Sequence, residues 1–225
     1  MQVNKRKTSG KPITPPKFPK QELETGLPEE PLLDRTYYAQ RVFSHDNLSG
    51  QEAERVSFDQ ILFQHVNLNK TCFKKVQVID SRLTVCDLAN AQWIEACLSR
   101  VELIGCHLVG LQCSEAQFQD VLFKECRANF SQFAFATFKA VRFENCDLSE
   151  VNFLEADLSG VTFVNCDLRH ADLTGTRLVG VDLRSSQIDG ARVGPLELKS
   201  AIIDSNQALA FVRGMGITVM PPNET

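Results

Sequence analysis

Apolar residues recur at every fifth position through most of this chain. Steps of five from Phe43 to Val193 give 31 positions, all of them apolar, and 24 of these are Leu or Phe. A period of five fits neither the 3.6-residue period of an α-helix nor the two-residue period of a β-strand. The backbone must therefore change direction once in every five-residue unit, which is typical of a repeat architecture.

A second period, of twenty residues, sets the size of one coil. Two positions before the central apolar residue, separate columns hold cysteine, valine and alanine at intervals of twenty. These columns are Cys86, Cys106, Cys126, Cys146 and Cys166; Val101, Val121, Val141, Val161 and Val181; and Ala96, Ala116, Ala136 and Ala156. Four five-residue sides per coil, with neighbouring coils about 4.8 Å apart, would stack like side chains in ladders. The sequence thus predicts an all-β protein, a quadrilateral parallel β-helix of about eight coils.

Glycines mark the predicted corners of the coil. Seven of the 12 glycines fall two positions after a central residue, where a tight corner can require a positive φ. These are Gly50, Gly105, Gly110, Gly160, Gly175, Gly180 and Gly190.

Short strings within the repeat resemble the pentapeptide repeat family. They are Cys-Asp-Leu-Ser-Glu at 146–150, Ala-Asp-Leu-Ser-Gly at 156–160, Cys-Asp-Leu-Arg-His at 166–170 and Ala-Asp-Leu-Thr-Gly at 171–175. The resemblance runs in one phase over about 150 residues. It implies that the β-helix is right-handed, and we place this β-helix at residues 35–203.

Residues 1–34 form a proline-rich arm outside the repeat. They hold six of the nine prolines, and residues 1–20 carry six basic groups and no acidic one. Such a composition favours a flexible, extended segment. It is either an untidy terminus or a basic arm that touches a polyanion or a partner. Alternatively, the Pro-Pro-Lys-Phe-Pro stretch lies along the coil and buries Phe18.

Residues 204–225 form a capping helix and a tail. Asp204-Ser205 resembles a helix N-cap, which predicts a helix over about 205–213 that stops at Gly214 or Gly216. An open coil end exposes core side chains, and this helix would cover it. The apolar residues here exceed what one short cap has to cover, and they are Leu209, Phe211, Val212, Met215 and Ile217, followed by Val219 and Met220. The module is similar to that of quinolone-resistance-type members, which implies a homodimer through this end; capping of a monomer is the alternative.

Motifs that carry chemistry are missing from the sequence. Five cysteines stacked in one column behave as small buried fillers, so we expect neither disulfides nor a zinc set, and we expect a reducing cytoplasm. His45 and His65 share an outward column one coil apart but have no evident third metal ligand. A convex prism without long loops should offer no cleft for an acid/base pair. We therefore expect no enzyme, no cofactor and no metal.

The outward positions hold the candidate binding residues. Glu95, Glu115 and Glu155 share one outward column, and Phe130 and Phe135 fall two positions after a central residue, where they should face solvent. A large exposed apolar pair usually marks contact with another molecule. The alternative is that the amino-terminal arm covers it.

These features favour a non-catalytic rigid scaffold that binds a protein partner through its lateral face. The net charge of −4 argues against direct nucleic-acid binding, and no apolar run is long enough to cross a membrane. The family resemblance implies an alternative, since some members bind DNA gyrase, a type II topoisomerase, as imitations of DNA and protect it from quinolones or toxins. Basic residues such as Lys75 and Arg142 interrupt the acidic columns here, and no inserted loop breaks the repeat.

Overall fold

The computed structural model describes residues 12–26 and 31–220, and these residues form twelve strands and one helix. The helix, α1, spans Ser205–Gly214. The strands are β1 (Glu24–Thr25), β2 (Tyr37–Ala39), β3 (Arg41–Ser44), β4 (Glu52–Glu54), β5 (Ser57–Asp59), β6 (Leu62–Gln64), β7 (Cys72–Lys74), β8 (Gln77–Thr84), β9 (Cys97–Ile104), β10 (Gln117–Lys124), β11 (Thr137–Glu144) and β12 (Val161–Val164). No helix among the described residues is long and apolar enough to cross a membrane.

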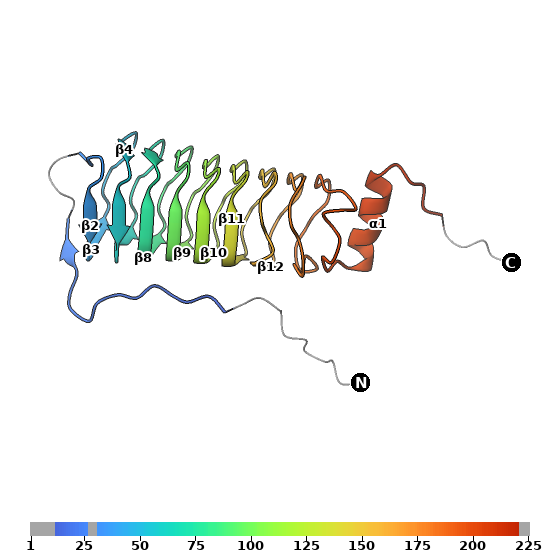
Figure 1. The fold of residues 1–225 in the computed structure, drawn as a ribbon, viewed down its shortest axis with the longest axis horizontal. Coiled ribbons are helices and arrows are strands. Elements are labelled where there is room, and N and C mark those ends of the chain that lie inside the picture. Colours follow the sequence, from blue (N-terminus) through green and yellow to red (C-terminus); the bar gives the residue numbers. More distant parts are fainter. Residues whose placement is uncertain (1–11, 27–30, 221–225) are drawn as a thin grey trace.

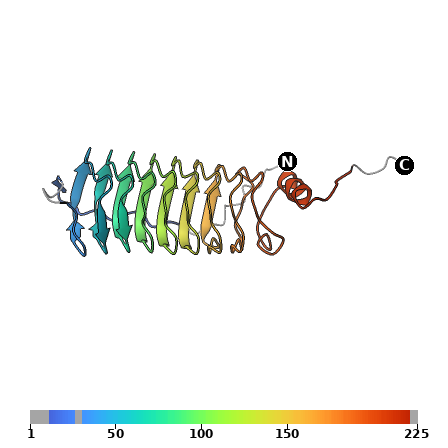
Figure 2. The same cartoon turned by 90° about the horizontal axis from the view of Figure 1, so that it is seen from above.

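All strand pairs are parallel, and between successive coils the register advances by twenty residues. The main sheet runs in the order β1-β3-β6-β8-β9-β10-β11-β12, and β4 pairs with β7 in a second sheet. Phe123, for example, lies between Leu103 of β9 and Phe143 of β11. Stacked in this way, the coils form one elongated parallel β-solenoid (Figures 1 and 2). It has about seven turns, which confirms the predicted parallel β-helix, and beyond β12 the coils pair through isolated bridges such as Asp172–Arg192.

The core is a continuous stack of the central apolar residues. Phe43, Phe143 and Leu183 are fully buried, and aromatic rings stack from coil to coil, as between Phe123 and Phe143 with centroids 4.5 Å apart. The cysteine column is buried as predicted. Its members at 106 and 126 occupy neighbouring coils, since the adjoining residues His107 and Arg127 form a parallel bridge. The twenty-residue coil inferred from the sequence is thus confirmed.

The corners require a left-handed backbone, which the predicted glycines supply in six of seven cases. Gly50 has φ 69° and Gly180 has φ 75°, and non-glycine residues such as Phe130 also adopt positive φ at their corners. Gly160 is the exception, because its φ is not in this region. An added Cβ at Gly160 would lie 2.6 Å from the carbonyl oxygen of Phe138, so close backbone packing explains this glycine.

Residues 12–26 lie along the solenoid, as in the alternative that places the Pro-Pro-Lys-Phe-Pro stretch against the coil; Phe18 is half-buried there. In Figure 1 they run beneath the coils, toward the carboxy-terminal end of the solenoid as the residue number falls. β1 adds a parallel strand to β3, and Leu32 is buried in the core, so the solenoid's contacts begin before residue 35. The arm thereby covers the first strand edge, which would otherwise offer unpaired backbone groups. Residues 1–11, 27–30 and 221–225, parts of the predicted arm and tail, lie outside the described residues.

Helix α1 covers the other end of the solenoid. Asp204 is its N-cap and forms a capping box with Gln207, and Gly216 follows the helix with φ 80°. The Gln207 Nε2 donates hydrogen bonds to the carbonyl oxygens of Leu183, at 2.8 Å, and Ser186, at 2.9 Å. Phe211 packs against the core. The cap therefore supplies a donor to the Ser186 carbonyl, which has no further coil to pair with, and a second donor to the Leu183 carbonyl, which already accepts from the Ser186 amide.

Replacing the cap residue should loosen this end of the solenoid. We expect Asp204→Ala to destabilise α1 by about 1 kcal/mol, because the amides of Asn206 and Gln207 lose their acceptor. Hydrogen exchange of the α1 amides measures this effect. Ser205→Ala, at the adjacent exposed position, is the control and should leave the exchange rates almost unchanged.

Candidate functional site

One face of the solenoid combines uncharged amides with apolar side chains. We call it the amide face; it lies between the corner that holds Phe130 and the corner that holds Phe135. Along one of its rows stand Gln92, Gln112, Gln132 and Asn152, and along the other stand Ile94, Ser114, Ala134 and Leu154. The Asn152 Nδ2 donates to the Gln132 Oε1 at 2.9 Å. Together with the hydrogen bond from the Gln132 Nε2 to the Phe130 carbonyl oxygen, at 3.0 Å, this contact holds the Gln132 side chain in place; we call the row of Gln92, Gln112, Gln132 and Asn152 the amide ladder.

Phe130 and Phe135 stand at the two corners of a single coil and are exposed as predicted. Their side chains are 47% and 50% exposed, and their φ angles are 61° and 60°. In each five-residue side, the central residue and the residue two positions before it point inward. The corner residue, two positions after the central one, therefore points away from the packed interior. Burying two rings of this size against a partner would remove a large apolar area from water.

Carboxylates line one edge of the amide face. Glu95, Glu115 and Glu155 are exposed in the same corner column as Phe135. Glu95 forms an ion pair with Lys75 at 3.3 Å, whereas among the described residues Glu115 and Glu155 have no ion pair. The five predicted binding residues therefore lie on one surface. Phe135 stands between Glu115 and Glu155 at one corner, and Phe130 stands at the other corner, next to the exposed Glu150.

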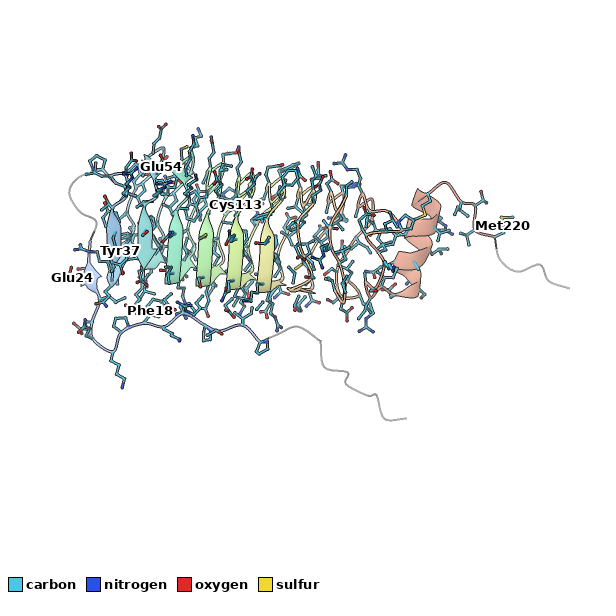
Figure 3. The ribbon with its side chains drawn as sticks, viewed as in Figure 1. Phe18, Glu24, Tyr37, Glu54, Cys113 and Met220 are labelled. Carbon is cyan, nitrogen blue, oxygen red and sulfur yellow. The ribbon has the colours of Figure 1, made fainter. Side chains whose placement is uncertain are left out.

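The described part of the arm does not cover this surface. The arm lies along the opposite side of the solenoid from β4, and Figure 3 shows Phe18 below the coils and Glu54 above them. Glu54 marks the side of the solenoid that holds the amide face, because it lies in the same row as Ile94 and Leu154. The alternative in which the arm shields Phe130 and Phe135 is thus wrong for residues 12–26, because these residues follow a different corner.

Elsewhere some acidic groups pair with neighbouring arginines. Arg169 and Asp167 approach to 2.5 Å, and the hydrogen bond from Arg169 holds the pKa of Asp167 below its usual value. Arg184 lowers the pKa of Asp182 in the same way. Such pairs leave few continuous rows of negative charge on the described surface.

The prediction that the prism has no cleft is wrong. A hollow of about 740 Å³ lies where β11 meets the coil of Gly160, and it is lined by Thr137, Lys139, Asp157, Ser159, Thr162, Arg184 and others. It forms because the corner at 140 lies within an eight-residue strand, whereas the chain turns tightly at 160. No histidine or cysteine lines the hollow, and its two carboxylates are paired with Arg177 and Arg184.

Thiols and histidines provide no evident reactive centre either. All eight cysteines are free. Burial raises the pKa of the Cys113 thiol, and the neighbouring Cys106 together with burial raises the pKa of Cys126 to about 12. His45 and His65 stack with ring centroids 4.9 Å apart. Within the described ranges, no three potential metal ligands come together.

The carboxy-terminal residues divide between the cap and the surface. Leu209, Phe211 and Val212 are half-buried, whereas Met215 and Ile217 are 46% and 53% exposed. Phe211 thus contributes to the cap. The predicted dimer through this end stays a prediction.

Two features of the surface escaped the sequence analysis. The amide ladder was visible as Gln92, Gln112 and Gln132 at intervals of twenty, a signal as regular as the cysteine column. The contacts of the arm with Asp80 and Asp120 had no such signal, because nothing in the repeat pairs residue 14 or 17 with a particular coil.

Comparisons with known proteins agree with this architecture. The model of a family described as the pentapeptide repeat region matches residues 96–148 and 136–209. No curated protein matches the sequence.

Several solved structures are similar to this chain. HetL, a pentapeptide repeat protein involved in heterocyst differentiation regulation from the cyanobacterium Nostoc sp. strain PCC 7120, is 19% identical; the match covers 77% of this chain and 90% of HetL, with a TM-score of 0.45. Full-length QnrB1, a plasmid-mediated fluoroquinolone resistance protein, is 16% identical over 81% of this chain and 100% of QnrB1, with a TM-score of 0.29. A pentapeptide repeat protein of the Arabidopsis thaliana thylakoid lumen is 20% identical over 48% of this chain and 74% of its own, with a TM-score of 0.19.

Proposed function

Because this chain belongs to the pentapeptide repeat family, a family of rigid coils, we propose that it is a non-catalytic scaffold that binds a protein partner through the amide face. The observation that carries the proposal is the exposure of Phe130 and Phe135 on one coil. Aromatic side chains that are held in place on a rigid support lose little conformational entropy on binding. They are also enriched among the residues that dominate binding energy.

The chemistry of the face defines the kind of partner. Between the two phenylalanines lie neutral side chains such as Gln132 and Ala134, so a partner can approach without removing water from a charge. The edge with Glu115 and Glu155 would attract a basic rim around an apolar centre. We therefore expect a protein surface with apolar groups spaced to meet both rings and with lysine or arginine beside them.

The gyrase hypothesis remains the second reading of the lateral surface. An imitation of DNA would require long rows of unpaired carboxylates. Residues Asp167 and Asp182 are instead paired with arginines in their own coils, and the amide face is uncharged along its middle. These observations favour the apolar, partner-binding reading over charge imitation.

A reducing compartment such as the cytoplasm fits the proposed scaffold. All eight cysteines are free, and the half-buried Cys72 and Cys97 would be open to oxidation in an oxidising compartment.

The double substitution Phe130→Glu/Phe135→Glu should abolish partner capture. It replaces both rings with charges at positions that are already exposed, so folding should be unaffected while the apolar contact is lost. Quantitative mass spectrometry of proteins retained from a lysate of the source organism by immobilised wild type and variant measures the effect. We expect at least one protein to be retained by the wild type and depleted tenfold or more with the variant.

A matched control separates the loss of the rings from the added charge. Val85→Glu/Val179→Glu makes the same change in charge at residues that are 51% and 56% exposed away from the amide face. It should retain the same partner as the wild type. Capture of one identical set of proteins by the wild type, the double variant and this control would refute the assignment of the amide face.

A further inference from the structure

A second surface, the corner on which the arm lies, has the features of a peptide-binding site. We call it the arm corner; it is formed by the column Gln40, Gln60, Asp80, Arg100 and Asp120. Two backbone amides of the arm donate to carboxylates of this column. The Thr14 amide donates to the Asp120 Oδ1 at 3.0 Å, and the Lys17 amide donates to the Asp80 Oδ1 at 2.9 Å.

The two carboxylates are spaced to accept from an extended proline-rich backbone. Asp80 and Asp120 lie two coils apart, about 9.6 Å at the spacing of paired strands. Three residues of a polyproline II helix span about 9.3 Å, which is the separation in sequence between Thr14 and Lys17. In a peptide with this conformation, amides three residues apart are therefore separated by nearly the same distance as carboxylates two coils apart.

The residues between these two anchors need no hydrogen-bond acceptor. Pro15 and Pro16 lack an N–H group, so from Thr14 to Lys17 the only backbone donors are the two amides that meet a carboxylate. Further contacts fix its direction, since the Gln60 Nε2 donates to the Lys17 carbonyl at 3.0 Å and the Arg82 guanidinium lies 5.8 Å from the centre of the Phe18 ring.

One of the two acceptors, Asp80, is held in place by the solenoid itself. Asp80 is 7% exposed, and Arg100 donates to both of its carboxylate oxygens at 2.6 Å. The arm contributes to this burial, whereas the pair with Arg100 belongs to the solenoid and orients the carboxylate toward the Lys17 amide. The next coils of the same corner, at Ala140 and Gly160, open into the hollow described above, so the track continues beyond Asp120.

We propose that the arm corner binds an extended, proline-rich peptide segment of a partner protein, with free backbone amides three residues apart, and that residues 12–18 occupy this site as an intramolecular ligand. This site lies on a different corner from the amide face and does not depend on the function proposed for that face.

The test opens the site within the full chain and offers the ligand in trans. Thr14→Pro/Lys17→Pro removes both donating amides while keeping the preference for an extended backbone, so the arm should leave the corner. Faster trypsin cleavage after Lys20 reports this release. A fluorescent peptide with the wild-type sequence of residues 12–20 should then bind the variant at least tenfold more tightly than it binds the wild-type chain, whose own arm competes.

The matched control is the same peptide with proline at the positions of Thr14 and Lys17. It has the same length and extended conformation but lacks the two donors, and it should bind the opened chain at least tenfold more weakly. Equal binding of the two peptides, or no saturable binding of the wild-type peptide up to millimolar concentration, would overturn the proposal. An arm that stays protected from trypsin in the variant would also overturn it, because the two amides would then not hold the segment.

Discussion

Phe143→Asp should prevent the solenoid from folding or destabilise it by more than about 5 kcal/mol. Removing a buried phenylalanine alone costs about 3–5 kcal/mol, and burial of an unpaired carboxylate adds several more. Phe143 is fully buried, with the rings of Phe123 and Phe163 stacked on its two sides at 4.5 and 5.5 Å between centroids. Since each coil is stabilised mainly by its neighbours, a defect in the middle divides the stack in two. Chemical denaturation followed by circular dichroism measures the loss.

Two further variants keep this prediction testable if Phe143→Asp yields no soluble protein. Phe143→Leu should cost less than about 1.5 kcal/mol, because Leu83 and Leu103 already occupy the same column. Glu155→Gln, at an exposed corner, should change stability by less than about 0.5 kcal/mol. A larger loss for Glu155→Gln than for Phe143→Leu would reverse the inward and outward assignments.

The inward half of this protein could be predicted from the sequence because every coil repeats the same packing problem. A residue such as Phe123 must fit between the residues twenty positions before and after it, so the columns keep their residue types. The same constraint made the exposure of Phe130 and Phe135 predictable, since corner side chains point away from the stack and the described part of the arm follows a different corner.

The hollow and the arm contacts could not be predicted in this way. The hollow depends on a change between a continuous strand at residue 140 and a tight turn at residue 160, and the apolar period is the same in both coils. The position of the arm depends on single contacts with Asp80 and Asp120, which occur once and leave no periodic signal. A structural feature that depends on a single contact leaves no periodic pattern in the sequence, so it cannot be predicted from the repeat.

The tight turn at residue 160 requires a glycine. Its chain passes so close to β11 that an added Cβ would meet the Phe138 carbonyl oxygen at 2.6 Å and the Ala140 nitrogen at 3.1 Å. Both are backbone atoms of a paired strand, so neither can rotate away as the end of a side chain would.

We expect Gly160→Ala to destabilise the solenoid by about 3 kcal/mol, because the methyl group must displace paired backbone. Gly180→Ala, in the same corner one coil further along, is the matched comparison. An added Cβ there meets nothing within 4 Å, and its φ of 75° is of the kind that alanine adopts at a cost of about 1 kcal/mol, as Ala140 already does at φ 53°. The two variants should therefore differ by about 2 kcal/mol in the free energy of unfolding measured with denaturant. If Gly180→Ala proved the more damaging of the two, the left-handed corner rather than the close approach to β11 would be what requires glycine in this column.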